Sequence, residues 1–337
     1  MTTLSPVPTQ REIVLTGDRT TGKLHLGHYV GSLKNRVQLQ ERYETYIMLA
    51  DVQALTTHFD RPAMLAESVR QVALDYLSVG IDPEKSTIFV QSMIPEIAEL
   101  TVIFSMFVTV SSLRHNPTVK HEAKERGYDD LYYGFLGYPV SQAADIAAFK
   151  ASLVPAGEDQ IPHIEQARKI VRRFNELYAP VLVEPEILVG ERLNGLDGGS
   201  KMSKSLGNAI SLDALPEEVS AQIRKAKTDP ARIHKTDPGH PEICTVFGYH
   251  SIFRQEGCEE IRENCMKGRL GCAACKAMVT EAIEEVMRPV RERRELYRHR
   301  EKDIDEIVMS GTAKAREAAR RTMGEVRGAM GINYFNK

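Results

Sequence analysis

The sequence predicts an α/β protein, with a doubly wound parallel sheet followed by an all-helical C-terminal domain. Two observations favour this fold. In the first part of the 337-residue chain, short apolar runs typical of buried strands alternate with segments of helical period. Beyond residue 207 the pattern changes and becomes helical. Strand–helix alternation produces right-handed βαβ units and a parallel sheet, which binds ligands at the carboxyl ends of its strands.

Composition limits the possible classes of protein. A chain of 337 residues is long enough for a sizeable core and two domains. The net charge of −2 means that any contact with nucleic acid depends on local basic patches. No apolar run approaches membrane-spanning length, and residues 1–11 lack the apolar core of a signal peptide. We therefore expect a soluble, cytoplasmic protein that has no membrane partner.

The first element, residues 12–16, is an apolar, β-branched run that predicts a buried strand. A loop bounded by Gly17 and Gly22 follows, and a helical pattern then runs to about residue 42. A helix N-terminus after a glycine-bounded turn favours a phosphate site, because its unpaired N–H groups and its dipole attract anions. His25 and His28 lie three residues apart, so both can face the same anion.

Two histidines near a helix start are by themselves a weak motif, because such residues are often capping or solvent-exposed. A second motif, KMSKS at residues 201–205, lies between polar, glycine-rich stretches that predict a mobile loop. A lysine pair in a loop is usually only solvated surface. Here the two lysines suit a clamp that closes over a triphosphate and stabilises charge on the leaving pyrophosphate.

The two motifs together, in this order and on either side of an α/β pattern, resemble the class I aminoacyl-tRNA synthetases. The hallmark motifs of that family are HIGH-like and KMSKS. The HLGH at residues 25–28 departs from the first by one aliphatic residue, and residues 201–205 match the second fully. The resemblance implies a Rossmann-like catalytic domain and adenylate chemistry. It implies four catalytic residues, namely His25, His28, Lys201 and Lys204.

The next elements continue the alternation. Residues 45–50 and 87–90 predict strands, and Pro62 to Val79 predicts an amphipathic helix. Asp51, Gln53 and Gln91 follow strand ends, where they line a site or merely cap a loop. Residues 97–133 have a less regular helical pattern. In the class I pattern, an insertion at about residues 95–137 forms much of a dimer interface, although core packing explains the same apolar residues nearly as well.

Residues 138–160 contain a predicted helix after Pro139, a short strand at 153–156 and a strand-end loop at 157–160. Asp145 lies among alanines on that helix, and a carboxylate in apolar surroundings is unfavourable unless it has a partner. The N–H of a ligand's indole ring would be a suitable partner. His163 then begins a long helix with a basic face.

These segments resemble the tryptophanyl-tRNA synthetases, which share the Ala-Ala-Asp-Ile and Gly-Glu-Asp-Gln patterns around Asp145 and Gln160. The resemblance implies that Asp145 binds the indole N–H, that Tyr138 and Gln160 hold the polar end of the amino acid, and that Ala156 borders the pocket. It implies a tryptophan site of Leu15, Gln53, Tyr138, Gln142, Asp145, Val154 and Gln160. It implies an ATP site of Gly17, Asp18, Arg19, Gly27, His28, Gly157, Asp159, Lys201, Met202, Ser203 and Lys204. Leu15, Asp18, Arg19, Gln142 and Ala156 differ from the residues usual in that family.

The C-terminal part begins with a predicted helix at Pro216, which has acidic residues in its first turn. Residues 288–321 contain eleven Lys or Arg against seven Asp or Glu, an excess suited to a phosphate backbone or simply to a solvated helix face. The resemblance implies a catalytic domain at 1–212 and a helical anticodon-binding domain at 213–320. Residues 321–337, chiefly 323–330, are expected to pack back on the catalytic domain.

All five cysteines lie between Cys244 and Cys275, unlike the scatter of a disulfide framework. Four of them follow the spacing C-x20-C-x6-C-x2-C, namely Cys244, Cys265, Cys272 and Cys275. Four thiolates that include a CxxC suit Zn²⁺ or a [4Fe–4S] cluster. Some bacterial members of the resembled family carry a [4Fe–4S] cluster on very similar spacing, so the resemblance favours the cluster, with zinc as the alternative.

The predicted reaction has two steps. The carboxylate of L-tryptophan attacks the α-phosphate of ATP, which is bound with Mg²⁺, and the terminal ribose hydroxyl of tRNA(Trp) then attacks the adenylate. We expect a homodimer that does not bind DNA. Three alternatives remain open: a tyrosyl-tRNA synthetase, a small-molecule nucleotidylyltransferase, and a non-catalytic paralogue that acts as a binding partner.

Overall fold

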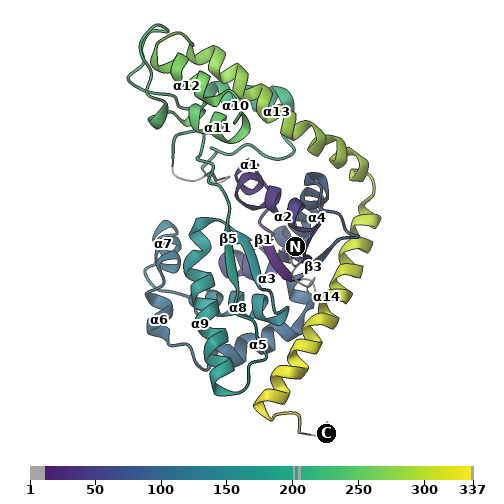
Figure 1. The fold of residues 1–337 in the computed structure, drawn as a ribbon. Coiled ribbons are helices and arrows are strands. Elements are labelled where there is room, and N and C mark those ends of the chain that lie inside the picture. The colour runs from purple at the N-terminus through teal and green to yellow at the C-terminus, as the bar shows by residue number, and fades with distance from the viewer. Residues whose placement is uncertain (1–11, 200–201, 204–205, 335–337) are drawn as a thin grey trace, which may run out of the picture.

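The computed structural model describes residues 12–199, 202–203 and 206–334. A five-stranded, wholly parallel sheet lies at the centre of the larger part (Figure 1). Its strands, in the spatial order β3-β2-β1-β4-β5, are β1 Ile13–Arg19, β2 Glu44–Ala50, β3 Ser86–Val90, β4 Leu153–Ala156 and β5 Glu186–Val189. The chain winds in opposite directions from β1, so β1 and β4 flank the point where a doubly wound sheet binds ligands. The predicted α/β class is confirmed.

Helices follow most strands. In the first part they are α1 Leu26–His28, the π-helix η1 Tyr29–Leu33, α2 Lys34–Leu39, α3 Asp51–His58, α4 Pro62–Val79, the 3₁₀ helix η2 Gln91–Met93, α5 Pro95–Ser105, α6 Val110–Arg114, α7 Pro117–Glu125, α8 Tyr133–Ala148, the 3₁₀ helix η3 Glu158–Gln160 and α9 Ile161–Leu177. Those of the second part are α10 Pro216–Lys225, the 3₁₀ helix η4 Pro241–Ile243, α11 Thr245–Phe253, α12 Cys258–Met266, α13 Cys272–Tyr297 and α14 Glu301–Met330.

Several boundaries differ from the sequence expectation. The helix after His25 ends at Leu39 rather than near residue 42. Pro139 lies inside α8 instead of preceding a helix. A proline there removes one backbone hydrogen bond and crowds the carbonyl four residues earlier, but this stretch of α8 is buried, so packing stabilises the helix across that position. Helix α9 begins at Ile161, ahead of His163, with a proline in its first turn. The sequence expectation did not include β5, although residues 187–189 are an apolar run of Ile, Leu and Val; the strand is short, lies at the edge of the sheet and is mostly exposed.

The sheet separates two hydrophobic clusters. Successive residues of β2 point to opposite faces, so Tyr46 and Met48 enter one cluster while Ile47 and Leu49 enter the other. The first cluster contains apolar residues of α5, α8, α9 and α14. The second continues through α4 into α10, α11 and α13, so the core of the helical domain is continuous with that of the sheet domain.

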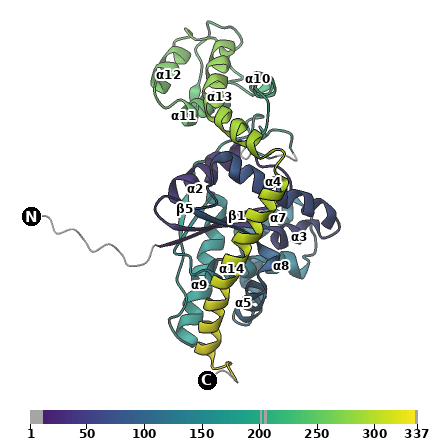
Figure 2. The ribbon, with the colours of Figure 1, turned by 90° about the vertical axis from the view of Figure 1, so that its right-hand side faces the viewer.

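Helix α14 covers the edge strand β3 and runs along the sheet domain in both ribbon views (Figures 1 and 2). The backbone N–H of Val90 donates to Thr312 Oγ1 at 3.1 Å, so a helix side chain satisfies a group that an edge strand would leave unpaired. A Cβ at Gly311 would lie 2.0 Å from the Ile88 carbonyl oxygen, so only glycine permits this approach. The packing of α14 on the sheet thus begins about ten residues before Met323.

Helices α10 to α13 form the part that projects from one end of the sheet domain, and the C-terminal half of α13 returns to α4 (Figure 1). Arg293 of α13 donates to the Ser78 carbonyl at 2.7 Å. Within the described ranges, no helix has both the length and the apolar character needed to cross a membrane.

Candidate active site

The side chains of His25 and His28 cap backbone N–H groups at the N-terminus of α1. Nδ1 of His25 accepts the N–H of Gly27 at 3.1 Å, and Nδ1 of His28 accepts the N–H of His25 at 3.2 Å. Their ring centroids lie 3.8 Å apart. Because both Nδ1 atoms accept, each neutral ring carries its proton on Nε2. The first turn thus presents two imidazoles whose distal nitrogens are donors.

The second motif docks directly on the first. Met202 is buried, and a Cβ placed on Gly27 would lie 3.2 Å from Met202 Cβ, so the absence of a side chain at Gly27 permits close contact. Beyond the motif, the Ile210 carbonyl accepts the N–H of Leu26 at 2.8 Å. Leu212 donates its N–H to the Leu24 carbonyl at 3.1 Å. Lys201 and Lys204 lie outside the described residues.

An Asp–Asn pair holds the base of the KMSKS loop. Asn208 Nδ2 donates to Asp197 Oδ1 at 2.9 Å, and Asn208 Oδ1 accepts the N–H of Ser203 at 2.7 Å. The backbone N–H of Gly199 and the Asn208 amide hold the pKa of Asp197 below its usual range. Sequence reasoning missed this pair, although polar residues beside glycines at both ends of the loop were a visible signal.

Asp145 is 2 % exposed, and its partner in the structure is an amide. Gln91 Nε2 lies 2.8 and 3.0 Å from the two carboxylate oxygens, and Gln91 Oε1 accepts the backbone N–H of Gln53. Burial raises the pKa of Asp145 to about 7; the Gln91 hydrogen bond opposes this rise, and the charge of Asp51 adds to it. A neutral amide therefore holds a buried carboxyl that titrates near neutral pH.

Other predicted tryptophan-site residues lie close to Asp145 in the fold. Tyr138, Gln142 and Asp145 are spaced four and three residues apart on α8, so they share one helix face. The Tyr138 hydroxyl lies 3.0 Å from Nε2 of His163, a partner that sequence reasoning did not identify. Gln142 Nε2 donates to Gln160 Oε1 at 3.2 Å.

The remaining residues of this group lie on the elements around that face. Gln160 Nε2 donates to Asp159 Oδ2 at 3.1 Å, which brings the predicted tryptophan and ATP sites together. Leu15 on β1 and Val154 on β4 are buried in one hydrophobic cluster. Gln53 Oε1 is buried and has no hydrogen-bond partner among the described residues. Gly157 directly follows β4.

Asp18 and Arg19, predicted to bind ATP, have protein partners. Asp18 Oδ2 accepts from Arg36 Nη1 at 2.6 Å and from the Tyr76 hydroxyl at 2.9 Å. Burial favours a higher pKa for Asp18, but the charges of Arg36 and His28, together with the hydrogen bonds from Arg36 and Tyr76, outweigh it and lower the pKa below its usual value. Arg19 pairs with Glu122 at 2.7 Å, which links the end of β1 to α7. Gly17, within β1, precedes this pair of residues.

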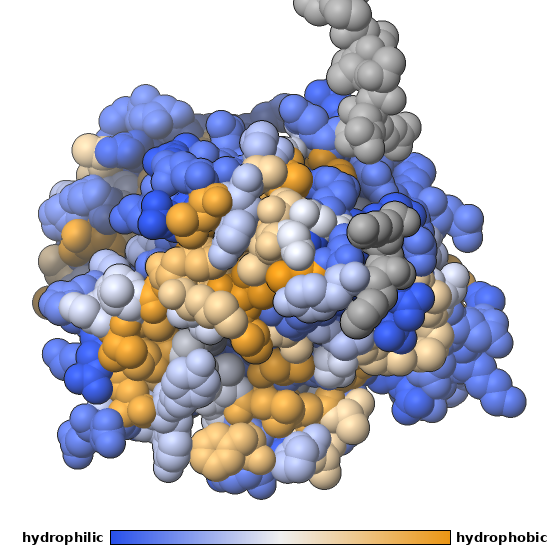
Figure 3. Space-filling view, turned by 90° about the horizontal axis from the view of Figure 1, so that it is seen from below, coloured by the Kyte–Doolittle hydropathy of each residue, from blue (hydrophilic) through white to orange (hydrophobic). Residues whose placement is uncertain are grey.

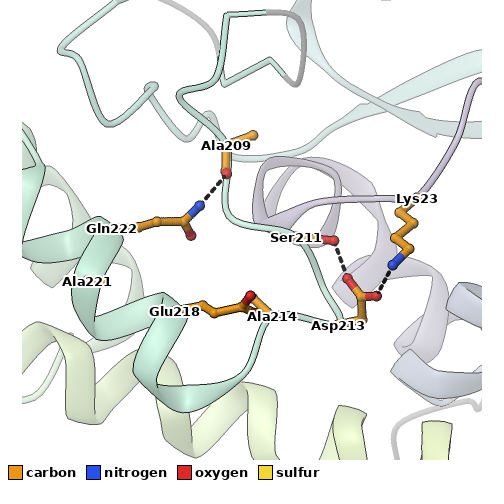
Figure 4. Close-up of a pocket in the computed structure, with 8 residues that line it drawn as sticks. All are labelled: Lys23, Ala209, Ser211, Asp213, Ala214, Glu218, Ala221 and Gln222. Carbon is orange, nitrogen blue, oxygen red and sulfur yellow. Dashed lines mark hydrogen bonds and ion pairs between the residues drawn. The ribbon is translucent and has the colours of Figure 1, made fainter.

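A cavity of about 540 Å³ lies beside the segment that follows the KMSKS loop (Figure 4). Its lining residues are Lys23, Ala209, Ser211, Asp213, Ala214, Glu218, Ala221 and Gln222. Lys23 Nζ and Ser211 Oγ each lie 2.5 Å from the Asp213 carboxylate. This cavity is distinct from the predicted tryptophan and ATP residues.

The four spaced cysteines converge in the helical domain. Cys244, Cys265, Cys272 and Cys275 all line one cavity of about 20 Å³, together with the apolar residues Phe247, Ile261 and Leu270. Arg232 Nη1 lies 3.7 Å from Cys265 Sγ, and His250 Nε2 lies 3.3 Å from Cys275 Sγ. Across the described part of the chain, however, no three His, Cys, Asp or Glu side chains are arranged as ligands of a metal ion.

Comparisons with known proteins identify the family of the chain. The family model of class I tRNA synthetases (W and Y) matches residues 8–288. The tryptophan–tRNA ligase of Clostridium longisporum is 50% identical over 336 residues, which cover 97% of this chain and 98% of that protein. The corresponding ligase of Streptococcus pneumoniae is 48% identical over 339 residues, with 97% and 99% covered.

Among solved structures, tryptophanyl-tRNA synthetase from Campylobacter jejuni, complexed with ADP and tryptophan, superimposes with a TM-score of 0.80 at 32% identity. The match covers 95% of this chain and 99% of that one. The enzyme from Mycoplasma pneumoniae has the same fold, with a TM-score of 0.81 at 24% identity and coverage of 96% and 98%. The chain therefore belongs to the class I tRNA synthetases of the tryptophan and tyrosine group.

Proposed function

We propose that this protein is a tryptophan–tRNA ligase, which activates L-tryptophan with ATP and transfers it to the 3′ end of tRNA(Trp). Asp145 carries the assignment. An ionised carboxylate only accepts hydrogen bonds and an indole N–H only donates, so the two are complementary. The Gln91 amide orients the carboxylate without neutralising its charge. The high identity to tryptophan–tRNA ligases over almost the whole chain supports the same assignment.

The amino acid is held from two sides in this proposal. Leu15 and Val154 form apolar walls for the indole, and Gln142 with Gln53 adds polar contacts near it. Tyr138 and Gln160 bind the ammonium and carboxylate end. The apolar indole and the charged end of tryptophan are thus bound by different residues. A few polar groups fix the orientation of the ligand in an otherwise apolar pocket.

ATP binds across the N-terminus of α1, where Nε2 of His25 and of His28 donates to its phosphates. Gly17, Gly27 and Gly157 allow close approach, Asp159 helps to shape the ATP site, and Mg²⁺ accompanies the phosphates. Asp18 and Arg19 pair with Arg36 and Glu122. In this proposal they help to form the ATP site because they lie at the end of β1. From the KMSKS loop, Met202 is buried and anchors the segment. The proposed role of Ser203 and of the two lysines, Lys201 and Lys204, is to bind the triphosphate.

The reaction needs no protein nucleophile. A tryptophan carboxylate oxygen bonds to the α-phosphorus while the bond to pyrophosphate breaks, and pyrophosphate leaves. The terminal ribose hydroxyl of tRNA then attacks the adenylate carbonyl, and AMP leaves. The protein accelerates both steps by holding the reactants in line and by stabilising the developing negative charge.

The decisive assay is ATP–pyrophosphate exchange measured with each of the twenty amino acids. We expect exchange with tryptophan alone, followed by charging of tRNA(Trp). Exchange with tyrosine instead would reassign the specificity. A folded protein that exchanges with no amino acid would contradict the proposal and favour a non-catalytic binding role.

The four cysteines bind a [4Fe–4S] cluster in this proposal, with Zn²⁺ as the alternative. In its favour are four thiols around one cavity, apolar walls, and N–H groups of Arg232 and His250 near two of the sulfurs. When bound, the cluster would connect Cys244, at the junction of η4 and α11, with α12 and α13. Anaerobic purification with iron, sulfide and zinc analysis tests it. Cys275→Ser should lose iron and Cys258→Ser should keep it, whereas stoichiometric zinc without iron would exclude the cluster.

The protein forms a homodimer through the insertion at about residues 95–137. Large apolar side chains are exposed there, including Val102, Met106, Val110 and Tyr133. In Figure 3, apolar side chains gather on the end of the molecule where α5 lies. Light scattering tests the proposal, because Met106→Glu should yield a monomer. Met309→Glu, at an exposed methionine of α14, is the matched control and should leave the dimer intact.

Binding of tRNA uses the basic excess along α13 and α14. Several of its arginines, such as Arg298, Arg300 and Arg321, pair with an acidic residue three or four positions away in the chain, so these pairs reduce the positive potential that a phosphate would meet there. The logarithm of the tRNA-binding constant should fall linearly with the logarithm of the salt concentration. Replacing an arginine that contacts a phosphate should lower that slope by about one.

A further inference from the structure

Asp75, on α4, is a fully buried carboxylate outside every site described so far. Its Oδ2 accepts the backbone N–H of Leu24 at 2.7 Å. Its Oδ1 accepts from Arg294 Nη1 of α13 at 2.5 Å and from Gln71 Nε2 at 3.2 Å. One side chain therefore connects three segments that are far apart in sequence.

The Leu24 end of this connection adjoins the nucleotide site. Leu24 directly precedes His25, the N-cap of α1, so the bond from Asp75 fixes the chain where it enters that helix. The Leu24 carbonyl accepts from Leu212, in the segment that follows the KMSKS loop. A displacement of Leu24 would thus shift both hallmark motifs.

The Arg294 end belongs to the helical domain. Arg294 is only 14 % exposed and also lies 4.0 Å from Asp213, the carboxylate that accepts from Lys23 (Figure 4). Arg291, one turn earlier, donates to the Ala214 carbonyl at 3.1 Å. Charged side chains of α13 therefore contact both α4 and the segment that follows the KMSKS loop.

We propose that Asp75 and Arg294 are positioning residues for adenylate formation, which hold the His25 turn and the end of the KMSKS segment in register with the helical domain. The inference rests on the proposed function. Docking of the helix alone does not require them, because Arg293 already attaches α13 to α4 through the Ser78 and Val79 carbonyls. The charge of Arg293 also acts on Tyr29, but among the described residues Arg293 forms no hydrogen bond with either motif.

Arg293→Gln is therefore the matched control for Asp75→Asn. Asp75→Asn removes the buried carboxylate itself, and Arg294, which is 14 % exposed and loses that partner, still lies 4.0 Å from the Asp213 carboxylate. We expect kcat of tryptophan-dependent pyrophosphate exchange to fall on the order of 10- to 100-fold in Asp75→Asn, the cost of a small misplacement of reacting groups. KM for tryptophan should stay within about twofold, because the amino-acid pocket is untouched.

The double variant Asp75→Asn with Arg294→Gln should be no slower than Asp75→Asn alone, because two residues of one unit are not additive. Arg293→Gln should keep wild-type kcat. Wild-type kcat in Asp75→Asn, or an equal loss in Arg293→Gln, would overturn the inference while leaving the proposed function standing. A wild-type protein without tryptophan-dependent exchange would overturn the proposed function and this inference with it.

Discussion

Asp18, near the carboxyl end of β1, and Asp145, on α8, are largely buried carboxylates, 12 % and 2 % exposed, and their partners are opposite in kind. Asp18 accepts from the guanidinium of Arg36 at 2.6 Å and from the Tyr76 hydroxyl. Asp145 accepts from one neutral amide, that of Gln91. The pKa of Asp18 is lowered despite burial, whereas burial raises the pKa of Asp145 to about 7.

The difference between these partners suits Asp18 to a role in stabilising the fold and Asp145 to a role in binding a ligand. A buried carboxylate with a cation and a hydroxyl partner has its charge compensated within the protein. A buried carboxylate whose partner is only an amide remains a strong hydrogen-bond acceptor for a ligand. Its uncompensated charge lowers the stability of the ligand-free protein. The proximity of Asp18 to ATP-binding elements thus does not by itself make its side chain a ligand group.

Removing the cation from the compensated pair should have the largest effect. Arg36→Met leaves the largely buried Asp18 carboxylate with the Tyr76 hydroxyl but without its cation, so the free energy of unfolding should fall by about 3–5 kcal/mol. Denaturant unfolding at pH 7.5 measures it. Arg70→Met removes a half-exposed ion pair with Asp305 and should change stability by less than about 1 kcal/mol. Equal effects at Arg36 and Arg70 would contradict the importance of burial.

Removing the charge from the uncompensated carboxylate should affect binding instead. Asp145→Asn loses a charge-assisted hydrogen bond to the ligand, so tryptophan should bind more weakly by about 1.5–3 kcal/mol. Titration calorimetry of the amino acid alone measures this change. The exposed Asp305→Asn variant should bind like the wild type. An unchanged Kd in Asp145→Asn would remove Asp145 from the binding site.

The two acids should also respond to pH with opposite signs. The folded-state pKa of Asp145 lies above its usual value of 3.8, so folding takes up a proton between about pH 4 and 7 and stability falls as pH rises through that window. Asp145→Asn should therefore raise Tm at pH 8, and by less at pH 5. The folded-state pKa of Asp18 is lowered, so its ionised carboxylate stabilises the fold at pH values above the usual pKa of 3.8. This stabilisation is lost as the pH falls below that value.

Asp18→Asn should accordingly lower Tm at pH 8, and its effect should shrink only below about pH 4, where the carboxylate of the wild type becomes protonated. Thermal unfolding of the two variants and the wild type across about pH 2–8 provides both comparisons. Shifts of the same sign in the two variants would show that the partners do not distinguish these acids.

The smallest expected effect concerns a neutral hydrogen bond on the same face of α8. Tyr138→Phe removes the hydroxyl that contacts His163, a change of about 1 kcal/mol, so KM for tryptophan should rise several-fold. Tyr46→Phe removes a hydroxyl that bonds Glu44 near the start of β2 and should leave KM unchanged. Pyrophosphate-exchange kinetics distinguish them, and equal KM values would mean that the Tyr138 hydroxyl does not reach the ligand.

Local patterns in the sequence determined a large part of this protein. The alternation of apolar runs and helical periods predicted β1 to β4 and the α/β class, and it predicted the bounds of α4 as Pro62 to Val79. The two motifs and the segments around Asp145 and Gln160 identified the family. These features are visible in sequence because each depends on neighbouring residues.

The tertiary structure alone decided the partners. Gln91 lies 54 positions before Asp145, and Arg36 lies 18 positions beyond Asp18. Helix α14 satisfies Val90 of β3 through Thr312, 222 positions away. No local period indicates which of many polar residues will meet at such separations. Whether a buried carboxylate is compensated depends on those meetings, because its charge interacts with whatever the fold brings within a few ångströms of it.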